Sequence, residues 1–156
     1  MKLEPRDCRL LAQLQLDSRI SNADLADRVG MSPSACWRRI RQLEDAGLIT
    51  GYRAEVRADR AGLAFEALVH VNLTRHNETH LEEFISAIAR RPEVMDCYAT
   101  TGKSDYHLRV VCGSIAAYTE FLEEFLFRLP AVASAETNVV LRQIKRSAVL
   151  PIAPIG

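Results

Sequence analysis

Two short helical segments joined by a glycine turn, within residues 21–47, constrain this chain more than any other feature of its sequence. Ser21 is a favourable N-cap residue, and Asp24 three positions later completes a capping box. Gly30 can adopt the left-handed conformation that ends a helix, and the Ser-Pro pair two residues later is a second helix start. These signals predict a helix-turn-helix unit.

The second predicted helix has one apolar face and one basic face. On a wheel of about 100° per residue, Cys36, Ile40 and Leu43 fall on the side that faces a core. Residues 33–43 contain three arginines and no acid, which is typical of a helix that enters the major groove of DNA. We expect base contacts from Ser34, Ala35 and Arg38, and phosphate contacts from Ser32, Arg39 and Arg41.

The segments on either side complete the N-terminal half. Residues 5–16 show an apolar stripe at helical spacing, and residues 48–56 alternate as a short strand or wing. We therefore expect a domain over residues 1–50 whose partner is double-stranded DNA. The alternative is an ordinary solvated helix face, in which Arg41 pairs with Asp45 one turn later.

Composition restricts the class of protein without identifying it. The 156 residues are 48% apolar, which is enough for one or two packed domains, and their formal net charge is zero. Residues 1–50 carry eight basic and seven acidic groups, whereas residues 63–156 carry nine and eleven. The small basic surplus lies where DNA contact is expected, and local charge governs phosphate contact. It favours several helices binding together in an oligomer.

Targeting and redox signals are weak in this chain. It shows no signal peptide and no apolar run of membrane-spanning length. Its four cysteines are far apart and each fits an apolar-face position: Cys8, Cys36, Cys97 and Cys112. We expect a cytoplasmic protein with no membrane partner and no disulfide framework.

From residue 65 the apolar pattern changes from helical to strand periodicity. Thr79 opens a capping box before a helix that Pro92 ends, and Ser114 and Pro130 bound a second helix. The remaining segments predict four strands, over residues 65–73, 94–101, 106–112 and 133–146. This β-α-β-β-α-β order is that of a ferredoxin-like domain, an antiparallel sheet with two helices on one face. The predicted fold class is α+β, a winged helix-turn-helix followed by this domain over residues 65–156, with a linker over residues 51–64.

The same apolar pattern predicts which side chains of the second half are buried. The first helix is expected to bury four apolar side chains: Leu81, Phe84, Ile85 and Ile88. A second apolar set is expected not to fit entirely under the helices: Val69, Val71, Leu108 and Val139. The other sheet face then needs a cover, and sheet-to-sheet dimerisation of two copies is the simplest one.

Several motifs give the chain a family resemblance. The helix-turn-helix reads Ile20-Ser-Asn-Ala-Asp-Leu-Ala, then Ser32-Pro-Ser-Ala-Cys-Trp-Arg-Arg-Ile, then Leu43-Glu-Asp-Ala-Gly-Leu-Ile-Thr-Gly-Tyr. The second half contains Thr101-Gly-Lys-Ser-Asp-Tyr. In these motifs the chain resembles, over essentially its whole length, the leucine-responsive/asparagine-responsive (Lrp/AsnC) family of prokaryotic transcription regulators. The resemblance implies DNA binding, a homodimer that assembles further to an octamer, and an amino acid or related small effector. We expect no cofactor.

The resemblance also implies where an effector binds. By position it assigns effector contacts to one turn and its neighbours: Tyr98, Thr101, Gly102, Asp105 and Tyr106. A glycine lets backbone N–H groups approach a carboxylate, and an aspartate is suited to an α-ammonium group. The chain has Lys103 and Ser104 where the family commonly has an acid and an aromatic residue. A plain β-turn is therefore the alternative.

Two rival functions use other residues. His76 and His80, with His70 and either Cys97 or Cys112 elsewhere, are metal-ligating residue types that would suit a metal-responsive regulator. The first two straddle a predicted helix start and lack the acid of a zinc-protease motif, so we expect no metal site. The other rival is an amino-acid-sensing module that does not bind DNA. No nucleophile–base arrangement or phosphate loop is recognisable, so we expect no catalytic residues.

Overall fold

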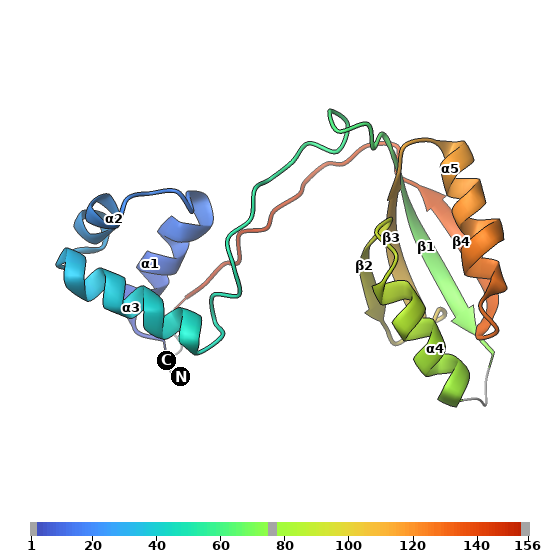
Figure 1. The fold of residues 1–156 in the computed structure, drawn as a ribbon, viewed down its shortest axis with the longest axis horizontal. Coiled ribbons are helices and arrows are strands. Elements are labelled where there is room, and N and C mark those ends of the chain that lie inside the picture. The colour runs from blue at the N-terminus through green and yellow to red at the C-terminus, as the bar shows by residue number, and fades with distance from the viewer. Residues whose placement is uncertain (1–2, 75–77, 154–156) are drawn as a thin grey trace. The chain divides into compact units, whose positions relative to one another are not determined.

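The computed structural model describes residues 3–74 and 78–153 and divides the chain into two compact units. Unit 1, which includes the segment up to residue 55, holds α1 (Pro5–Leu16), α2 (Asn22–Val29) and α3 (Pro33–Asp45) (Figure 1). Unit 2, residues 56–143, holds the following elements: β1 (Phe65–Leu73), α4 (Glu78–Ala89), β2 (Val94–Ala99), β3 (Tyr106–Cys112), α5 (Ile115–Glu120) and β4 (Val132–Val139). No helix among these described residues has the length and apolar character needed to cross a membrane.

The helices of unit 1 begin and end on the predicted cap residues. Ser21 Oγ accepts a hydrogen bond from the backbone N–H of Asp24 at 3.1 Å, and Ser32 Oγ accepts one from Ala35 at 3.3 Å. Gly30 closes α2 at φ 68° and ψ 47°, a left-handed conformation that a side chain would strain. The helix-turn-helix prediction is confirmed at each of these caps.

An apolar core holds the three helices together. Each helix contributes fully or nearly fully buried side chains: Leu10, Leu11, Leu25, Ala26, Val29, Cys36 and Leu43. Ile20, which precedes the α2 cap, and Ile40 pack against this core as partly buried residues. The predicted inner face of α3 is therefore confirmed.

One ion pair joins α1 to α3 inside unit 1. Asp7, which is 3% exposed, accepts hydrogen bonds from Arg39 Nε at 2.7 Å and Arg39 Nη2 at 2.6 Å. Its Oδ2 also accepts the backbone N–H of Glu4 at 2.9 Å, which completes a capping box at the start of α1. The hydrogen bonds from Arg39 hold the pKa of Asp7 below its usual range, and Asp7 raises the pKa of Arg39.

The predicted wing strand after α3 is not formed. α3 ends at Asp45, and residues 51–57 contain no strand. The N–H groups of Leu48 and Ile49 instead donate to the carbonyl of Leu43 at 3.0 and 3.2 Å. A strand needs a partner to pair with, and no strand of the described residues lies in unit 1.

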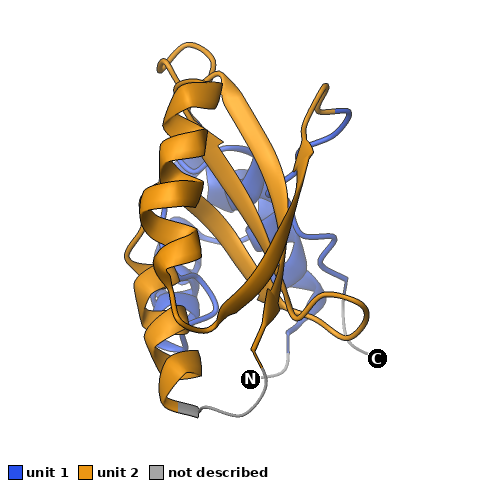
Figure 2. Cartoon of the chain, turned by 90° about the vertical axis from the view of Figure 1, so that its right-hand side faces the viewer, with its two compact units in different colours: residues 1–55, 144–156 blue, residues 56–143 orange. Residues whose placement is uncertain are grey.

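Unit 2 is a four-stranded antiparallel sheet in the order β2-β3-β1-β4 with both helices on one face (Figure 2). This arrangement confirms the predicted ferredoxin-like fold. β1 is one of the two central strands, and its successive side chains point to opposite faces of the sheet. Ala67, Val69 and Val71 are fully buried beneath the helices. The opposite side, called here the open face, carries the following residues: Glu66, Leu68, His70, Asn72, Asp96, Tyr98, His107, Arg109, Val111, Ser134, Glu136 and Asn138.

The predicted division of apolar residues between the two sheet faces is wrong. Val69, Val71 and Leu108 all lie on the helix side and are at most 1% exposed. They share one side because Val69 and Leu108 are register partners and Val71 lies two residues along β1. Val139 is 48% exposed because it is the last residue of its strand. The open face is mostly polar as a result.

The predicted buried face of α4 includes more residues than the structure buries. Phe84 and Ile88 are buried, whereas Leu81 is 36% and Ile85 49% exposed. The helix therefore packs on the sheet along a narrow stripe of residues one turn apart. Thr79, the predicted cap, lies inside this helix, which starts one residue earlier.

β4 is shorter than predicted and is followed by a returning segment. It ends at Val139 because β1 is its only neighbour in the sheet, and the last bond runs from Val140 N–H to Glu66 O at 2.9 Å. Residues from 144 onward group with unit 1, in contrast to the predicted domain over residues 65–156. There Gln15 donates to the carbonyl of Leu150 at 3.2 Å and accepts its N–H at 2.6 Å.

Replacing Asp7 by Asn tests the ion pair that joins α1 to α3. The change leaves a half-buried guanidinium without its carboxylate, so we expect the free energy of unfolding of unit 1 to fall by about 2–3 kcal/mol. Trp37 is the only tryptophan and lies in α3, so its fluorescence during urea unfolding reports on unit 1. Arg39→Lys keeps the charge and loses the bidentate contact, so it should lower the free energy of unfolding by less than Asp7→Asn does. An Asp7→Asn protein with the wild-type midpoint contradicts this structural role.

Because of the same ion pair, we expect the stability of the protein to fall in acid. Because the native-state pKa of Asp7 is lowered, its contribution is complete above the usual Asp pKa of about 3.9 and is lost as the pH falls through the lowered value. The wild-type unfolding midpoint should fall over this acid range, and that of Asp7→Asn should fall less. Parallel acid profiles for the two proteins would show that Asp7 carries no such contribution.

Candidate nucleic-acid interface and effector turn

α3 presents its two sides to different surroundings. Cys36 and Leu43 are fully buried, while Ser34 and Arg38 are exposed on the other side and Ala35 is half-buried. Within the described part of the chain, no hydrogen bond or ion pair engages the side chain of Arg38. Its guanidinium therefore keeps its five N–H donors for an external partner.

The N-terminus of α3 is held by two polar side chains. Ser32 Oγ caps the helix and lies 3.3 Å from Ser34 Oγ. Asn22 Nδ2 donates to the carbonyl of Pro33 at 2.8 Å, which links the start of α2 to the start of α3. The first N–H groups of a helix and its dipole favour an anion, so Ser32 lies at an end suited to a phosphate.

Arg39 does not belong to the exposed basic face. Its Nε and Nη2 donate to Asp7, and its Nη1 donates to Gln42 Oε1 at 2.9 Å. All three of its nitrogens are therefore engaged within unit 1, which favours a role in positioning α3 over the expected phosphate contact. The sequence offered no local signal for this pairing, because the two partners are 32 residues apart.

Arg41 and its neighbours form a polar group at the C-terminal end of α3. Arg41 pairs with Glu44 at 3.3 Å rather than with Asp45, and its guanidinium carbon lies 5.4 Å from the Trp37 ring centre. Tyr52 donates to Glu44 at 3.0 Å, and partial burial together with this bond raises the pKa of Tyr52 to about 12. Trp37 is 56% exposed. It is a candidate contact that is absent from the predicted set of DNA-contacting residues.

The turn between β2 and β3 is built around Asp105. Its backbone N–H donates to the carbonyl of Val71 at 3.0 Å, and its Oδ2 accepts the N–H of Leu73 at 2.8 Å. Thr100 closes the turn by donating its N–H to Asp105 O at 3.0 Å and its hydroxyl to Ser104 O at 3.1 Å. Asp105 is exposed, and its Oδ1 has no partner among the described residues. One carboxylate oxygen thus holds the turn, and the other is available to a ligand.

Gly102 gives this turn an accessible backbone. Its φ is 131°, a conformation that L side chains rarely adopt, and no atom lies within 4 Å of the position a Cβ would take. Thr101 and Gly102 are both exposed. Their backbone N–H groups are therefore open to a carboxylate.

The two predicted effector tyrosines lie on opposite faces of the sheet. Tyr98 is 59% exposed on the open face, where it is the register partner of His107. Tyr106 is half-buried on the helix side, and its ring centre lies 5.1 Å from that of Phe84. The structure thus brings Thr101, Gly102 and Asp105 together in one turn and separates the two tyrosines.

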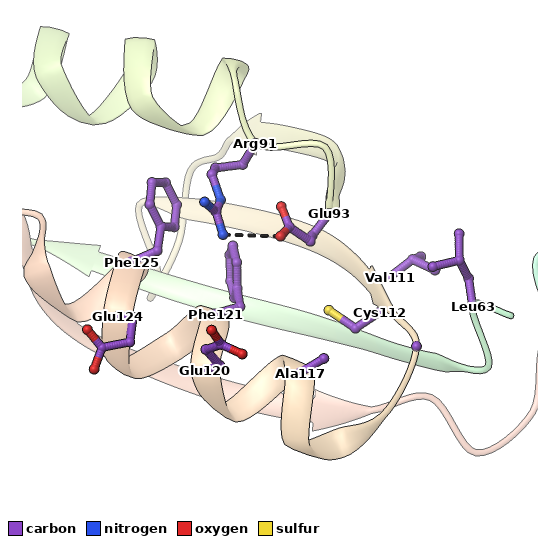
Figure 3. Close-up of a pocket in the computed structure, with 11 residues that line it drawn as sticks. Leu63, Arg91, Glu93, Val111, Cys112, Ala117, Glu120, Phe121, Glu124 and Phe125 are labelled. Atoms are coloured by element: carbon purple, nitrogen blue, oxygen red, sulfur yellow. Dashed lines mark hydrogen bonds and ion pairs between the residues drawn. The ribbon is translucent and has the colours of Figure 1, made fainter.

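A pocket of about 440 Å³ lies at the other end of β3 (Figure 3). The predicted second helix is not continuous there: α5 is followed by a π-helical turn, Phe121–Phe125, and a 3₁₀ turn. Arg91 lies 5.8 and 4.4 Å from the ring centres of Phe121 and Phe125 and pairs with Glu93 at 3.1 Å. It is the only cation among the described lining residues and is already paired, so this pocket offers no free cation to a carboxylate.

The structure describes only some of the residues that the alternative function, a metal-responsive regulator, would use as ligands. His76 lies outside the residues that the structure describes. Across the described ranges, no group of three or more His, Cys, Asp or Glu side chains is arranged to hold a metal. The four cysteines are free thiols, and Cys97 lies on the helix side of the sheet as the register partner of Leu108 but is exposed there, because β2 is an edge strand.

Known proteins resemble both halves of the chain. A family model described as winged helix-turn-helix DNA-binding matches residues 3–50, and one described as Lrp/AsnC ligand binding domain matches residues 66–150. The chain is 34% identical to the transcriptional regulator AzlB of Bacillus subtilis over 150 residues, 96% of each chain. It is 36% identical to the leucine-responsive regulatory protein of Escherichia coli over 145 residues, 93% of this chain and 88% of that protein.

Solved structures show the same fold. A transcriptional regulator of Neisseria meningitidis, solved as its L-Met complex, gives a TM-score of 0.92 at 33% identity and covers 96% of this chain and 97% of its own. AsnC of Escherichia coli gives 0.87 at 25% identity and covers 96% and 99%. Because both family models match in order and the relatives align over nearly their whole length, the chain belongs to the Lrp/AsnC family, whose members are transcription regulators and not enzymes.

Proposed function

We propose that this protein is a homo-oligomeric transcription regulator that reads double-stranded DNA with α3 and senses an amino acid or a related small molecule at the turn before β3. Its place of action is the cytoplasm. The observation that carries the DNA-binding role is the unengaged guanidinium of Arg38 on the exposed side of a helix whose other side is buried.

In this proposal some exposed residues of α3 contact the DNA bases and others contact the phosphates. Arg38 makes a bidentate contact to a guanine base, with Ser34 and Ala35 beside it at the base edges. Ser32 at the helix start and Arg41 at its exposed flank contact phosphates. Arg39 holds the helix against Asp7 and contacts no DNA.

The effector binds as a zwitterion at the turn between β2 and β3. The N–H groups of Thr101 and Gly102 receive its carboxylate, and the free Oδ1 of Asp105 receives its ammonium group. Tyr98 and Tyr106 flank the turn from opposite sheet faces. The L-Met complex of the Neisseria relative supports an amino acid as the ligand class.

Exposed apolar side chains support the oligomer. Val56, Leu141 and Ile144, on the two segments that join the units, are 66%, 95% and 78% exposed. Further copies of the chain would cover such residues in a dimer and then in an octamer. An effector that binds one arrangement more tightly shifts the assembly or the spacing of its α3 helices, and with it the occupancy of repeated DNA half-sites.

Replacing Arg38 by Ala tests the assigned base contact. We expect affinity for a duplex selected by the wild-type protein to fall about 10- to 100-fold, because a bidentate guanine contact contributes about 1–3 kcal/mol of discrimination. Affinity for an unrelated duplex should fall much less. Fluorescence anisotropy with labelled duplexes at one fixed salt concentration measures both values.

Arg9→Ala is the matched control, because it removes the same charge from an exposed position of α1. It should leave the ratio of selected to unrelated affinity unchanged. An Arg38→Ala protein that keeps this ratio would refute the base contact. Absence of salt-dependent duplex binding by the wild-type protein would favour the non-DNA-binding sensor instead.

Replacing Asp105 by Asn tests the effector turn. An amino acid at about 100 times its dissociation constant should add about 2.7 kcal/mol to the stability of the protein, seen as a rise in the midpoint of thermal unfolding. The Asn side chain keeps an acceptor for Leu73 N–H and loses the charge. We expect its effector affinity to be about 10- to 100-fold weaker, since hydrogen bonds to charged groups contribute about 1.5–3 kcal/mol.

Lys103→Ala is the control for this experiment, because it changes a neighbouring exposed charge in the same turn. Its effector affinity should stay within a few-fold of wild type. An Asp105→Asn protein that binds the effector as tightly as wild type would move the site away from this turn.

A further inference from the structure

The pocket at the C-terminal end of β3 has no part in the proposed function. Its volume is about 440 Å³, a size typical of small-molecule sites. The residues that α5 and Cys112 contribute place it on the helix side of the sheet, away from the face that a second copy of the chain would cover. β3 separates it by about 20 Å from the turn that holds Asp105, since a strand rises about 3.4 Å per residue.

Two walls of the pocket carry acidic side chains. Glu93 belongs to the wall formed by the start of β2 and the end of β3, and Glu120 and Glu124 belong to the wall formed by α5 and the π-helical turn (Figure 3). Glu124 is paired with Arg128 at 2.8 Å. Within the described residues, no hydrogen bond or ion pair engages the carboxylate of Glu120. The helix wall therefore offers one unpaired negative charge.

Glu93 supplies an unpaired oxygen on the other wall. Its Oε1 accepts a hydrogen bond from Arg91 Nη2 at 3.1 Å. Its Oε2 is buried and has no hydrogen-bond partner among the described residues. A buried carboxylate oxygen without a donor is unfavourable, so a ligand that brings an N–H group to this atom is bound more strongly than at an exposed acid.

Two phenylalanine rings of the pocket already contact one cation. The guanidinium carbon of Arg91 lies 4.4 Å from the ring centre of Phe125 and 5.8 Å from that of Phe121, the geometry of a cation–π contact. Both rings come from the π-helical turn, a departure from regular helix that is frequent at functional sites. The described lining carries three carboxylates and this one guanidinium, so it favours a further cation.

We propose that this pocket binds a small aliphatic diamine in its doubly protonated form. One ammonium group donates to Glu93 Oε2, and the other contacts the carboxylate of Glu120 on the facing wall. The methylene chain between them lies against apolar lining residues: Leu63, Ala117 and Phe121. A ligand with carboxylates at the same positions is repelled by both acids. The site is thus separate from the effector turn in place and in ligand charge.

Calorimetric titration of the purified full chain with the short diamine putrescine tests the proposal without DNA or an amino acid. We expect saturable binding of putrescine and none of succinate, a dicarboxylate of the same chain length. In Glu93→Gln the amide oxygen still accepts from Arg91, and the amide NH₂ replaces the acceptor that the ligand needs. This variant should bind putrescine at least about 10-fold more weakly, as loss of a hydrogen bond to a charged group does.

Glu120→Gln removes the second charge from an exposed position, so it should leave folding intact. We expect it to weaken putrescine binding about 2- to 5-fold, because an exposed ion pair contributes less than a buried one. Glu123→Gln is the matched control, since Glu123 is an exposed acid of the π-helical turn that does not line the pocket. It should bind putrescine as wild type does.

Thermal unfolding without ligand checks that each variant folds. Absence of saturable putrescine binding by the wild-type protein overturns the proposal. Unchanged binding in either folded pocket variant, or a Glu123→Gln protein weakened as much as Glu120→Gln, also overturns it. Asp105→Asn should bind putrescine as tightly as wild type does, so a failure of this site is distinguished from a failure of the effector turn.

Discussion

The ion pair between Asp7 and Arg39 is the interaction on which the DNA-binding unit depends. Adjacent residues of a helix point about 100° apart, so fixing Arg39 inward against α1 also fixes where Arg38 points. The small core of unit 1 positions α3 by packing, and the two-pronged contact adds a preferred rotation about the helix axis. The direction of the Arg38 side chain thus depends on a neighbour whose own partners lie within unit 1.

Alternation along β1 plays the corresponding part in unit 2. One side of the strand is buried beneath the helices, and the other carries the polar open face. Asp105 links the turn between β2 and β3 to the end of this strand through hydrogen bonds to Val71 and Leu73. β1 follows the linker from unit 1, and β4 leads into the segment that returns to Gln15. A structural change at the turn between β2 and β3 therefore has two chain segments through which it can reach the helices of unit 1: the linker before β1 and the segment after β4.

Local signals in the sequence predicted most of the elements. The caps at Ser21 and Ser32, the glycine stop and the strand alternation depend only on neighbouring residues, and all were confirmed. Features set by distant partners were missed or misplaced. Arg39 finds a carboxylate 32 residues away, β4 ends where its neighbour begins, and the wing segment has no strand to pair with. The separation of the two turn tyrosines depends on register and becomes clear only in the sheet.

Selection from a pool of random DNA duplexes shows whether the protein recognises a DNA sequence and whether an amino acid changes that recognition. The full-length protein is incubated with the pool, with and without a mixture of amino acids, and the bound duplexes are sequenced. We expect enrichment of one short motif, repeated at a regular spacing as an oligomer requires, and an effector-dependent change in which spacings are bound. Bound duplexes as diverse as the starting pool under both conditions would contradict a sequence-specific, effector-responsive regulator.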